Sequence, residues 1–233
     1  MRISFFERCN QNLSKTLEIF VLNDQPSIAN EFVNQLRDVH IQKDSMRFRR
    51  NLERIGELLA FEISKTMEYE QKEIETPLTK TKGGFLKQQP VLINILRAGI
   101  PFFQGFHQIF DNAQCGFIGA YRKEGIGIEG LSINMEYFTL PDLNDRTVIL
   151  ADPMLATGKS LVESVNQMLK VGQPKKIHIA AVIASKQGID YIEKNIKIPC
   201  AIWVAEIDPE LNENAYIVPG LGDAGDLAFG PKL

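Results

Sequence analysis

Short unbroken runs of apolar residues alternate along the chain with longer segments in which apolar residues recur every three or four positions. The short runs are typical of strands buried on both faces of a parallel sheet, and the longer segments of amphipathic helices. Strands are predicted at 17–22, 91–96, 114–120, 147–151, 177–184 and 199–207. Helices are predicted after Ser27, from near Ser45, over 102–110, between Gly158 and Gly172 and over 187–195, with a polar loop at 79–89. This alternation predicts an α/β fold with a mainly parallel, doubly wound sheet.

The stretch 146–171 joins a buried strand, an acid, a loop of small residues and a helix. Asp152 follows the strand, and Pro153 prevents a further ladder hydrogen bond. The loop's backbone N–H groups and the helix N-terminus attract an anion, so the unit is a candidate cradle for a sugar phosphate. An ordinary turn capped by Thr157 or Ser160 explains the same residues equally well. A nucleotide-triphosphatase P-loop is excluded, because Pro153 stands where that motif needs Gly.

An arginine stands at the end of the predicted strand 91–96. Arg97 faces the same edge as Asp152 if the two strands run parallel, because ligand sites lie at the carboxyl ends of such strands. Its planar, permanently charged guanidinium suits a diphosphate. A loop arginine paired with a nearby acid is the competing interpretation.

Composition and charge exclude several classes of protein. The 26 Lys and Arg against 29 Asp and Glu give a net charge of −3, with no basic footprint for nucleic acid. No apolar run nears the roughly 20 residues of a membrane helix, and no signal peptide is visible. Three scattered cysteines form no metal or disulfide pattern and suit the cytoplasm, and three scattered histidines suggest no catalytic role. The 233 residues suit a single domain, 1–233.

Four segments resemble the motifs of the uracil phosphoribosyltransferase family. They are ILRAG at 95–99, YRKE at 121–124, ILADPMLATGKS at 149–160 and YIVPGLGDAGD at 216–226. The resemblance covers about residues 16–230 and is densest at these loops. It implies a type I phosphoribosyltransferase fold, a mainly parallel sheet flanked by helices with a β-arm and a C-terminal base-binding hood. The implied parts are a leader at 1–15, a flexible β-arm at 121–141 that closes over the substrate, and a uracil-binding region at 208–233.

The resemblance also implies a reaction, in which uracil and phosphoribosyl diphosphate (PRPP) give uridine monophosphate (UMP) and pyrophosphate in pyrimidine salvage. It implies PRPP and uracil as substrates, with Mg²⁺ carried by PRPP and no metal bound directly by the protein. It further implies a homodimer or higher homo-oligomer without nucleic-acid or membrane partners. In many relatives the arginine loop contains a cis peptide bond that does not involve proline.

Site residues carried over from the family fall into three groups. The catalytic residues are Arg97, Arg122, Asp152 and Asp223. These four bind PRPP together with Pro153, Met154, Leu155, Ala156, Thr157, Gly158, Lys159 and Ser160. The uracil-binding residues, mainly through backbone groups, are Ile217, Gly222, Asp223 and Ala224.

Three positions depart from the family's usual text: Lys159 replaces a small residue, Leu227 an arginine and Pro231 a threonine. If position 159 needs a positive φ, the lysine strains the loop; otherwise its ammonium strengthens phosphate binding. Two alternatives to the enzyme stay open, a PRPP- or nucleotide-sensing regulator of pyrimidine genes and a catalytically weakened relative. A regulator that binds RNA needs a basic face, of which the charge of −3 gives no sign.

Overall fold

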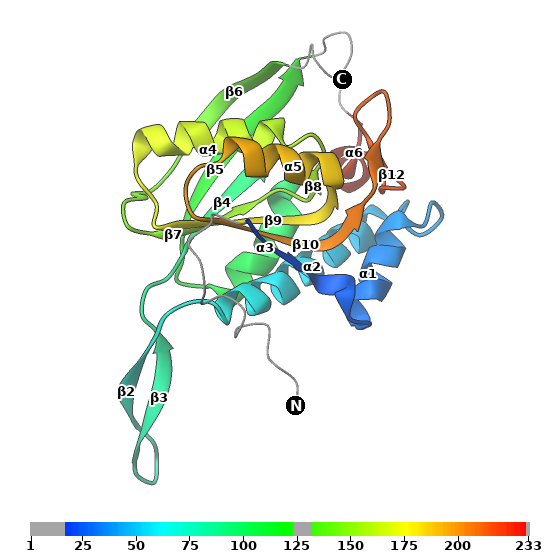
Figure 1. Cartoon of the computed structure of the whole chain (residues 1–233). Helices are drawn as coiled ribbons and strands as arrows, with labels where there is room; N and C mark the ends of the chain where they lie inside the picture. The colour runs from blue at the N-terminus through cyan, green and yellow to red at the C-terminus, as the bar shows by residue number, and fades with distance from the viewer. Residues whose placement is uncertain (1–16, 124–131, 232–233) are drawn as a thin grey trace, which may run out of the picture.

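A mainly parallel eight-stranded sheet runs through the middle of the molecule (Figure 1). The computed structural model describes residues 17–123 and 132–231, so the predicted leader at 1–15 and the tip of the predicted arm lie outside the described residues. The strand order is β1-β10-β9-β7-β4-β5-β6, with β8 paired to β9. Neighbours run parallel except for β5 and β6, which are antiparallel. The predicted α/β class and mainly parallel sheet are confirmed.

The elements have the following bounds. The sheet contains β1 (Glu18–Val21), β4 (Val91–Leu96), β5 (Gln114–Lys123), β6 (Ser132–Thr139), β7 (Thr147–Ala151), β8 (Met154–Leu155), β9 (Lys176–Ser185) and β10 (Cys200–Asp208). Two smaller ribbons pair β2 (Tyr69–Glu75) with β3 (Lys80–Leu86) and β11 (Glu210–Leu211) with β12 (Ile217–Val218). The helices are η2 (Leu22–Asp24), α1 (Ile28–Arg37), α2 (Ser45–Ser64), α3 (Gly99–Ile109), α4 (Lys159–Val171), α5 (Lys186–Asn195) and α6 (Ala224–Phe229).

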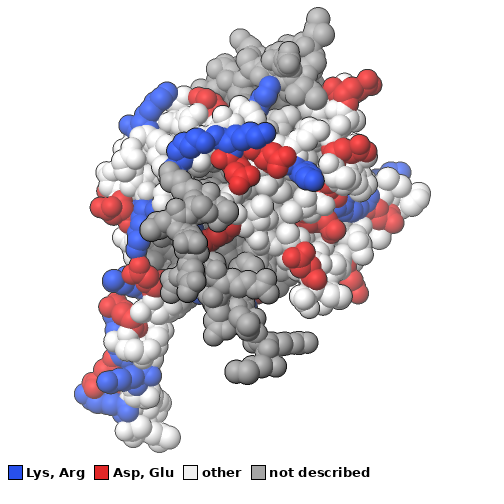
Figure 2. Space-filling view, in the orientation of Figure 1, with Lys and Arg blue, Asp and Glu red and all other residues white. Residues whose placement is uncertain are grey.

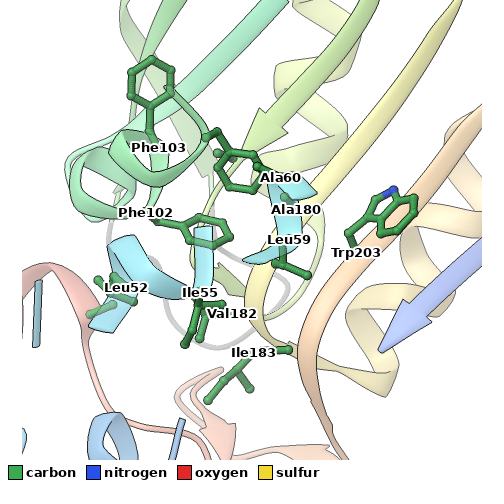
Figure 3. Packing of buried hydrophobic residues seen from close by; sticks show 14 of the residues in the cluster. Leu52, Ile55, Leu59, Ala60, Phe102, Phe103, Ala180, Val182, Ile183 and Trp203 are labelled. Carbon is green, nitrogen blue, oxygen red and sulfur yellow. The ribbon is translucent and has the colours of Figure 1, made fainter. Parts of the chain in front are cut away.

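Helices cover both faces of the sheet, with α1, α2 and α3 on one face and α4 and α5 on the other (Figure 1). Successive side chains of a strand point to opposite faces, so the central strands need apolar residues at every position. Figure 3 shows part of the core under α1–α3, with Phe102 and Trp203 among its members. Leu92 of β4 belongs to this core, whereas Ile93 belongs to the core under α4 and α5. This double burial is the reason that these strands read as unbroken apolar runs.

The predicted polar loop at 79–89 is wrong, because residues 80–86 form strand β3 of the β2–β3 hairpin. The hairpin projects away from the body of the molecule (Figure 1). Neither of its faces is buried, and lysines and acids alternate along it (Figure 2), as in the Lys80–Glu73 ion pair of 2.7 Å. A strand without a buried face shows no apolar alternation, so the usual sequence signal is missing.

Two further boundaries bear on the site. Helix α3 begins at Gly99 rather than at the predicted Phe102, so it follows directly on the arginine loop. In the range of the predicted arm, β5 and β6 pair antiparallel up to Lys123 and Ser132; the arm's flexibility stays a prediction. Across the described residues 17–123 and 132–231, we find no helix with the length and apolar character needed to cross a membrane.

Candidate active site

Arg97 and Asp152 lie at the same edge of the sheet. Strands β4 and β7 are parallel neighbours, and Asn94 of β4 stands opposite Ala151, the last residue of β7. Asp152 follows Ala151 directly, and Arg97 follows the end of β4 at Leu96. The predicted meeting of these two strand ends is confirmed, and it places a cation beside an acid at the edge where ligands bind in such sheets.

The loop that follows Asp152 is fixed to β9 and α5. The carbonyl of Pro153 accepts hydrogen bonds from the N–H groups of Val182 and Ile183, at 3.0 and 3.1 Å. The buried hydroxyl of Ser185 donates to the carbonyl of Ala156 at 2.6 Å and accepts from Gly188 N at 2.9 Å. Such contacts hold a loop in one conformation before any ligand arrives.

Helix α4 begins without a side-chain cap. Its N-cap residue is Gly158, in a left-handed conformation with φ of 74°. Thr157 Oγ1 accepts only a long hydrogen bond of 3.4 Å from Lys159 N. The first N–H groups of a helix have no partner within the helix. The interpretation of the loop as a turn capped by Thr157 thus describes one long hydrogen bond, and the start of α4 stays compatible with an anion cradle.

Lys159 does not strain the loop. Among the described residues the only positive φ angles outside glycine belong to Asp145 and Ala215, and Lys159 is the first residue of α4. Its side chain lines a shallow hollow of about 280 Å³ between α4 and α5, together with Glu163 and Tyr191. Gly158 takes up the unusual backbone conformation instead, which leaves position 159 open to a long side chain.

Arg97 connects the strand-end loop to the C-terminal segment. The Leu96–Arg97 peptide bond is cis, as the resemblance implied for this loop. The guanidinium lies 2.6 Å from Asp226 Oδ1 and donates to the carbonyl of Gly230 at 2.9 Å. The competing interpretation, an arginine paired with a nearby acid, thus describes a real contact. The acid, however, belongs to the segment predicted to bind the base.

The segment 217–224 approaches the same place from the far end of the chain. Gly225 packs against the arginine loop, because a Cβ there would lie 3.6 Å from Arg97 Nε and 3.8 Å from Ala98 Cβ. Asp223 caps α6 by accepting from Asp226 N at 3.0 Å. Gly220 and Gly222 have positive φ angles of 58° and 93°. The segment therefore turns sharply and presents backbone groups beside the cation.

The other predicted base-segment residues lie within this fold. Ile217 and Ala224 are buried and share one core cluster with Ala156 of the loop 153–160. Gly222 and Asp223 form the turn before α6. Leu227, where relatives carry arginine, packs partly buried against that cluster, and Pro231 is exposed beyond α6. Both predicted substrate segments thus pack on the same core, whereas Arg122 lies in β5 and its side chain is outside the described residues.

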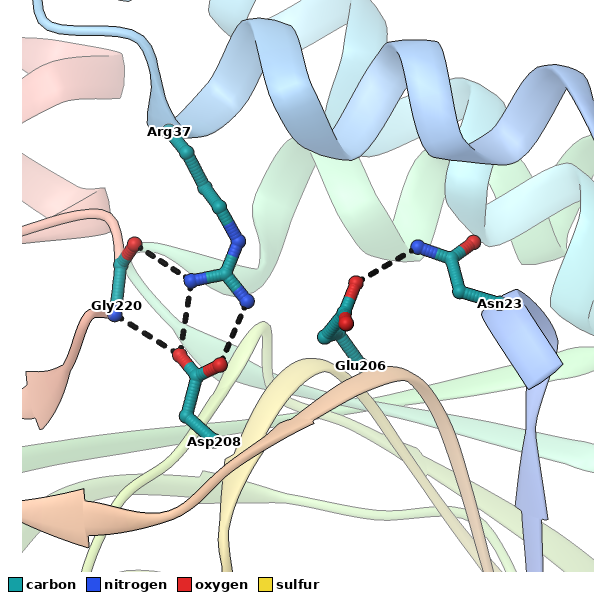
Figure 4. A network of polar contacts seen from close by, with 5 residues as sticks. All are labelled: Asn23, Arg37, Glu206, Asp208 and Gly220. Atoms are coloured by element: carbon teal, nitrogen blue, oxygen red, sulfur yellow. Dashed lines mark hydrogen bonds and ion pairs between the residues drawn. The ribbon is translucent and has the colours of Figure 1, made fainter. Parts of the chain in front are cut away.

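Sequence analysis missed a buried ion pair beneath the C-terminal segment. Asp208, the last residue of β10, binds both Arg37 of α1 and the backbone of Gly220 (Figure 4). Asp208 could have been singled out as an acid at the end of an apolar strand. Arg37 carries no local signal. Asn94, fully buried in β4 with no hydrogen-bond partner for its amide, interrupts an apolar run and was also passed over.

His178 is buried and Cys200 is partly buried against the core, and their side chains are not poised for chemistry. Burial lowers the pKa of His178 to about 3, and its neutral Nδ1 accepts a hydrogen bond from Trp203 Nε1 at 2.9 Å. Burial likewise raises the pKa of the Cys200 thiol to about 12. His178 is a satisfied structural histidine, as the sequence suggested. Within the described part of the chain, no three His, Cys, Asp or Glu side chains group so as to hold a metal ion.

Comparison with known proteins gives the family. The family model "Uracil phosphoribosyltransferase" matches residues 22–231. A uracil phosphoribosyltransferase of Porphyromonas gingivalis is 46% identical over 217 residues, covering 93% of this chain and 100% of the relative. One of Thermococcus gammatolerans is 41% identical, with 92% and 94% covered.

A solved structure supports the same conclusion on the level of the fold. The AQ2163 protein from Aquifex aeolicus superposes with a TM-score of 0.81 at 33% identity, over 91% of this chain and 98% of that one. The predicted type I phosphoribosyltransferase fold is confirmed, and none of the relatives named here favours a regulator. The sequence motifs, the fold and the contact between Arg97 and the C-terminal segment agree with these matches. The chain belongs to the uracil phosphoribosyltransferase family.

Proposed function

We propose that this chain transfers the phosphoribosyl group of PRPP to uracil, forming UMP and pyrophosphate. The bond between ribose C1 and uracil N1 forms as the bond from C1 to the diphosphate oxygen breaks, and N1 loses its proton. The observation that carries the proposal is the position of Arg97. It stands at the end of β4, beside the strand that leads to Asp152, and is paired with Asp226 of the C-terminal segment.

On the donor side, Asp152 accepts hydrogen bonds from the ribose hydroxyls and the loop 153–160 binds the 5′-phosphate. The N-cap residue Gly158 supports this, because it has no side chain that competes with a ligand at the start of α4. Arg97 and Arg122 stabilise the negative charge that accumulates on the departing pyrophosphate. The barrier is lowered mainly by such preorganised charges.

On the acceptor side, backbone groups at Ile217 and at 222–224 bind the base. An N–H of this segment donates to the C4 oxygen of uracil, where cytosine presents an amino group. Two donors facing each other cost about 1–3 kcal/mol for each group left unsatisfied. The left-handed turns at Gly220 and Gly222 support this role, since they expose main-chain groups rather than side chains.

Magnesium enters with PRPP rather than with the free protein. Mg²⁺ prefers oxygen ligands and keeps several of its waters, so it needs only carboxylates that hold a hydrated ion. Asp152 and Asp223 would supply such oxygens to the hydrated ion, and Asp223 would also orient PRPP. The ion would neutralise part of the diphosphate charge.

We further propose a homo-oligomer in the cytoplasm. The projecting β2–β3 hairpin carries Leu78, 95% exposed, at its tip and the half-exposed rings of Tyr69 and Phe85. A lone two-stranded hairpin is marginally stable in water, so a second copy of the chain gives these side chains a partner. The free thiols of Cys115 and Cys200 suit a reducing compartment.

An assay of pyrophosphate release tests the reaction. The protein is mixed with Mg-PRPP and, in separate reactions, uracil, cytosine, hypoxanthine or orotate. We expect release with uracil, and UMP as the second product. Release with orotate or hypoxanthine but not uracil removes the base assignment, and no release with any base favours the catalytically weakened relative.

A further inference from the structure

A largely buried ion pair fixes the loop that is proposed to bind uracil. It joins Arg37, near the N-terminus, to Asp208 at the end of β10. Arg37, the last residue of α1, donates from Nη2 to Asp208 Oδ1 at 2.7 Å and from Nη1 to Oδ2 at 2.9 Å (Figure 4). The side chain of Asp208 is 5% exposed and that of Arg37 is 19% exposed. Two parallel hydrogen bonds between a guanidinium and a carboxylate fix both groups in orientation as well as in distance.

The same pair binds both polar groups of one residue in the loop. Gly220 N donates to Asp208 Oδ2 at 2.9 Å, and Arg37 Nη1 donates to the carbonyl of Gly220 at 2.9 Å (Figure 4). Gly220 lies in a left-handed conformation where a Cβ would meet the carbonyl of Ile217 at 2.0 Å. The direction of the chain after Gly220 is therefore set by Arg37 and Asp208.

Neighbouring contacts act in the same sense. Arg49 of α2 donates to the carbonyl of Ala228 at 2.7 Å, and Arg97 donates to that of Gly230. With its amide oriented to suit its neighbours, Gln42 donates to the carbonyl of Leu221 at 2.9 Å. Side chains from residues 37–97 thus hold the C-terminal segment by its main chain at several points. At Gly220 both the N–H and the carbonyl group are bound.

We propose that Arg37 and Asp208 are positioning residues for the base, which set uracil affinity and the preference for uracil over cytosine without touching either substrate. The proposal rests on the proposed function, because it assigns base recognition to the main chain at 222–224. A backbone N–H at 222–224 can distinguish the C4 carbonyl of uracil from the amino group of cytosine only if that N–H is held in place. A displacement of about 1 Å costs up to roughly 100-fold in rate. Gly220 stands two residues before Gly222, so its orientation is transmitted directly.

Arg37→Lys tests the proposal. Lysine keeps the charge and pairs with Asp208, but it lacks the planar fork that also reaches the carbonyl of Gly220. We expect the KM for uracil to rise roughly tenfold and the selectivity for uracil over cytosine to fall, with the KM for PRPP within about twofold of wild type. Arg50→Lys is the matched control, because Arg50 lies on the surface of α2 and its ion pairs within the described part of the chain are to Glu53 and Glu57. It should change none of these values.

A second variant and a second measurement distinguish a loss of folded protein from a change in uracil binding. Asp208→Asn keeps the size of the side chain and one oxygen acceptor, and should give the same uracil-specific rise in KM. Thermal unfolding of each variant is recorded beforehand. A purely structural role predicts less folded enzyme with both KM values unchanged, and that result overturns the proposal.

Hydrogen exchange without substrate separates this inference from the proposed function. In Arg37→Lys the amides of 220–224 should exchange faster than in wild type, whereas those of 159–163 and all amides of Arg50→Lys should not. Equal exchange at 220–224 in wild type and Arg37→Lys overturns the inference even in an active enzyme. If the wild type forms no UMP, the proposed function fails, and the exchange experiment still decides whether Arg37 holds the loop.

Discussion

Gly158 allows the turn at the end of the loop 153–160, which is proposed to bind phosphate, because it lacks a side chain. Its φ of 74° belongs to the left-handed region, and a Cβ there would lie 2.7 Å from the carbonyl of Gly188. The turn brings the start of α4 close to Gly188 of α5. The backbone conformation of Gly158 therefore sets the direction in which α4 leaves the loop.

Gly158→Ala should therefore destabilise the fold and impair PRPP binding. The left-handed conformation costs an alanine about 1–2 kcal/mol, and the contact with Gly188 adds a cost of overpacking of about 1–3 kcal/mol. Urea unfolding and the KM for PRPP are the measurements. The control is Gly84→Ala on the hairpin, where the nearest atom to a Cβ is 3.7 Å away. Equal midpoints for the two variants would contradict this account of Gly158.

Asp152→Asn should impair the use of PRPP severely. A hydrogen bond from a sugar hydroxyl to a charged group contributes about 1.5–3 kcal/mol, so the loss of charge toward two hydroxyls lowers kcat/KM by roughly 10²–10⁴-fold. The rate at limiting PRPP is measured. Asp190→Asn, at an exposed acid of α5, is the control and should match wild type. An unaltered rate in Asp152→Asn would make that carboxylate structural.

At the scale of the element, a buried hydrogen bond joins the neighbouring strands β9 and β10. His178 of β9 and Trp203 of β10 are joined by a hydrogen bond of 2.9 Å inside the core under α1–α3. The imidazole accepts that bond only when Nδ1 is unprotonated. The β9–β10 pair is therefore linked to pH, although neither residue belongs to the site.

Acid should weaken the fold through His178. Its pKa is about 3 in the folded chain against 6.5 for an ordinary histidine, because of burial. The unfolded chain therefore binds a proton that the folded chain excludes. The stabilisation is complete above pH 6.5 and is lost progressively as the pH falls toward 3, amounting to about 2 kcal/mol by pH 5. Urea unfolding at pH 7.5 and pH 5 measures this loss.

His178→Gln is the control for this pH dependence. The variant is less stable at neutral pH, but glutamine does not titrate, so its loss between pH 7.5 and pH 5 should be smaller by about 2 kcal/mol. Parallel losses in the two proteins would show that other groups cause the acid sensitivity.

Long elements with a buried face were the ones that the sequence predicted most clearly, and an exposed hairpin was missed. The buried strands β4, β7 and β9 have apolar runs, and α1 and α2 have apolar residues at helical steps. The hairpin β2–β3 buries neither face and was mistaken in part for a loop. The start of α3 was placed three residues late, because Gly99 and Pro101 read as a continuation of the arginine loop.

At the scale of the whole molecule, the hairpin bears on assembly. It projects from the body of the molecule (Figure 1). Leu78 is almost fully exposed there, and Phe85 is 41% exposed. If a second chain covers these residues, Leu78→Glu combined with Phe85→Glu places charges in the interface and should shift the protein to monomers at micromolar concentration. Light scattering coupled to gel filtration gives the mass. Val171→Glu, on the exposed side of α4, is the control and should keep the wild-type mass. A monomeric wild type contradicts the proposed oligomer.

The sequence by itself determined most strands of the main sheet, most of the helices and the placement of an acid, a cation and a small-residue loop at strand ends. These features follow from local rules, since burial imposes a period on the residues of one element and a strand end fixes where its next residue lies. Only the tertiary structure decided which partners meet. Arg97 contacts Asp226, 129 residues away, and Arg37 contacts Asp208, 171 residues away. Such pairs form because the sheet and its helices bring distant parts of the chain together. The local sequence around one partner gives no indication of the other.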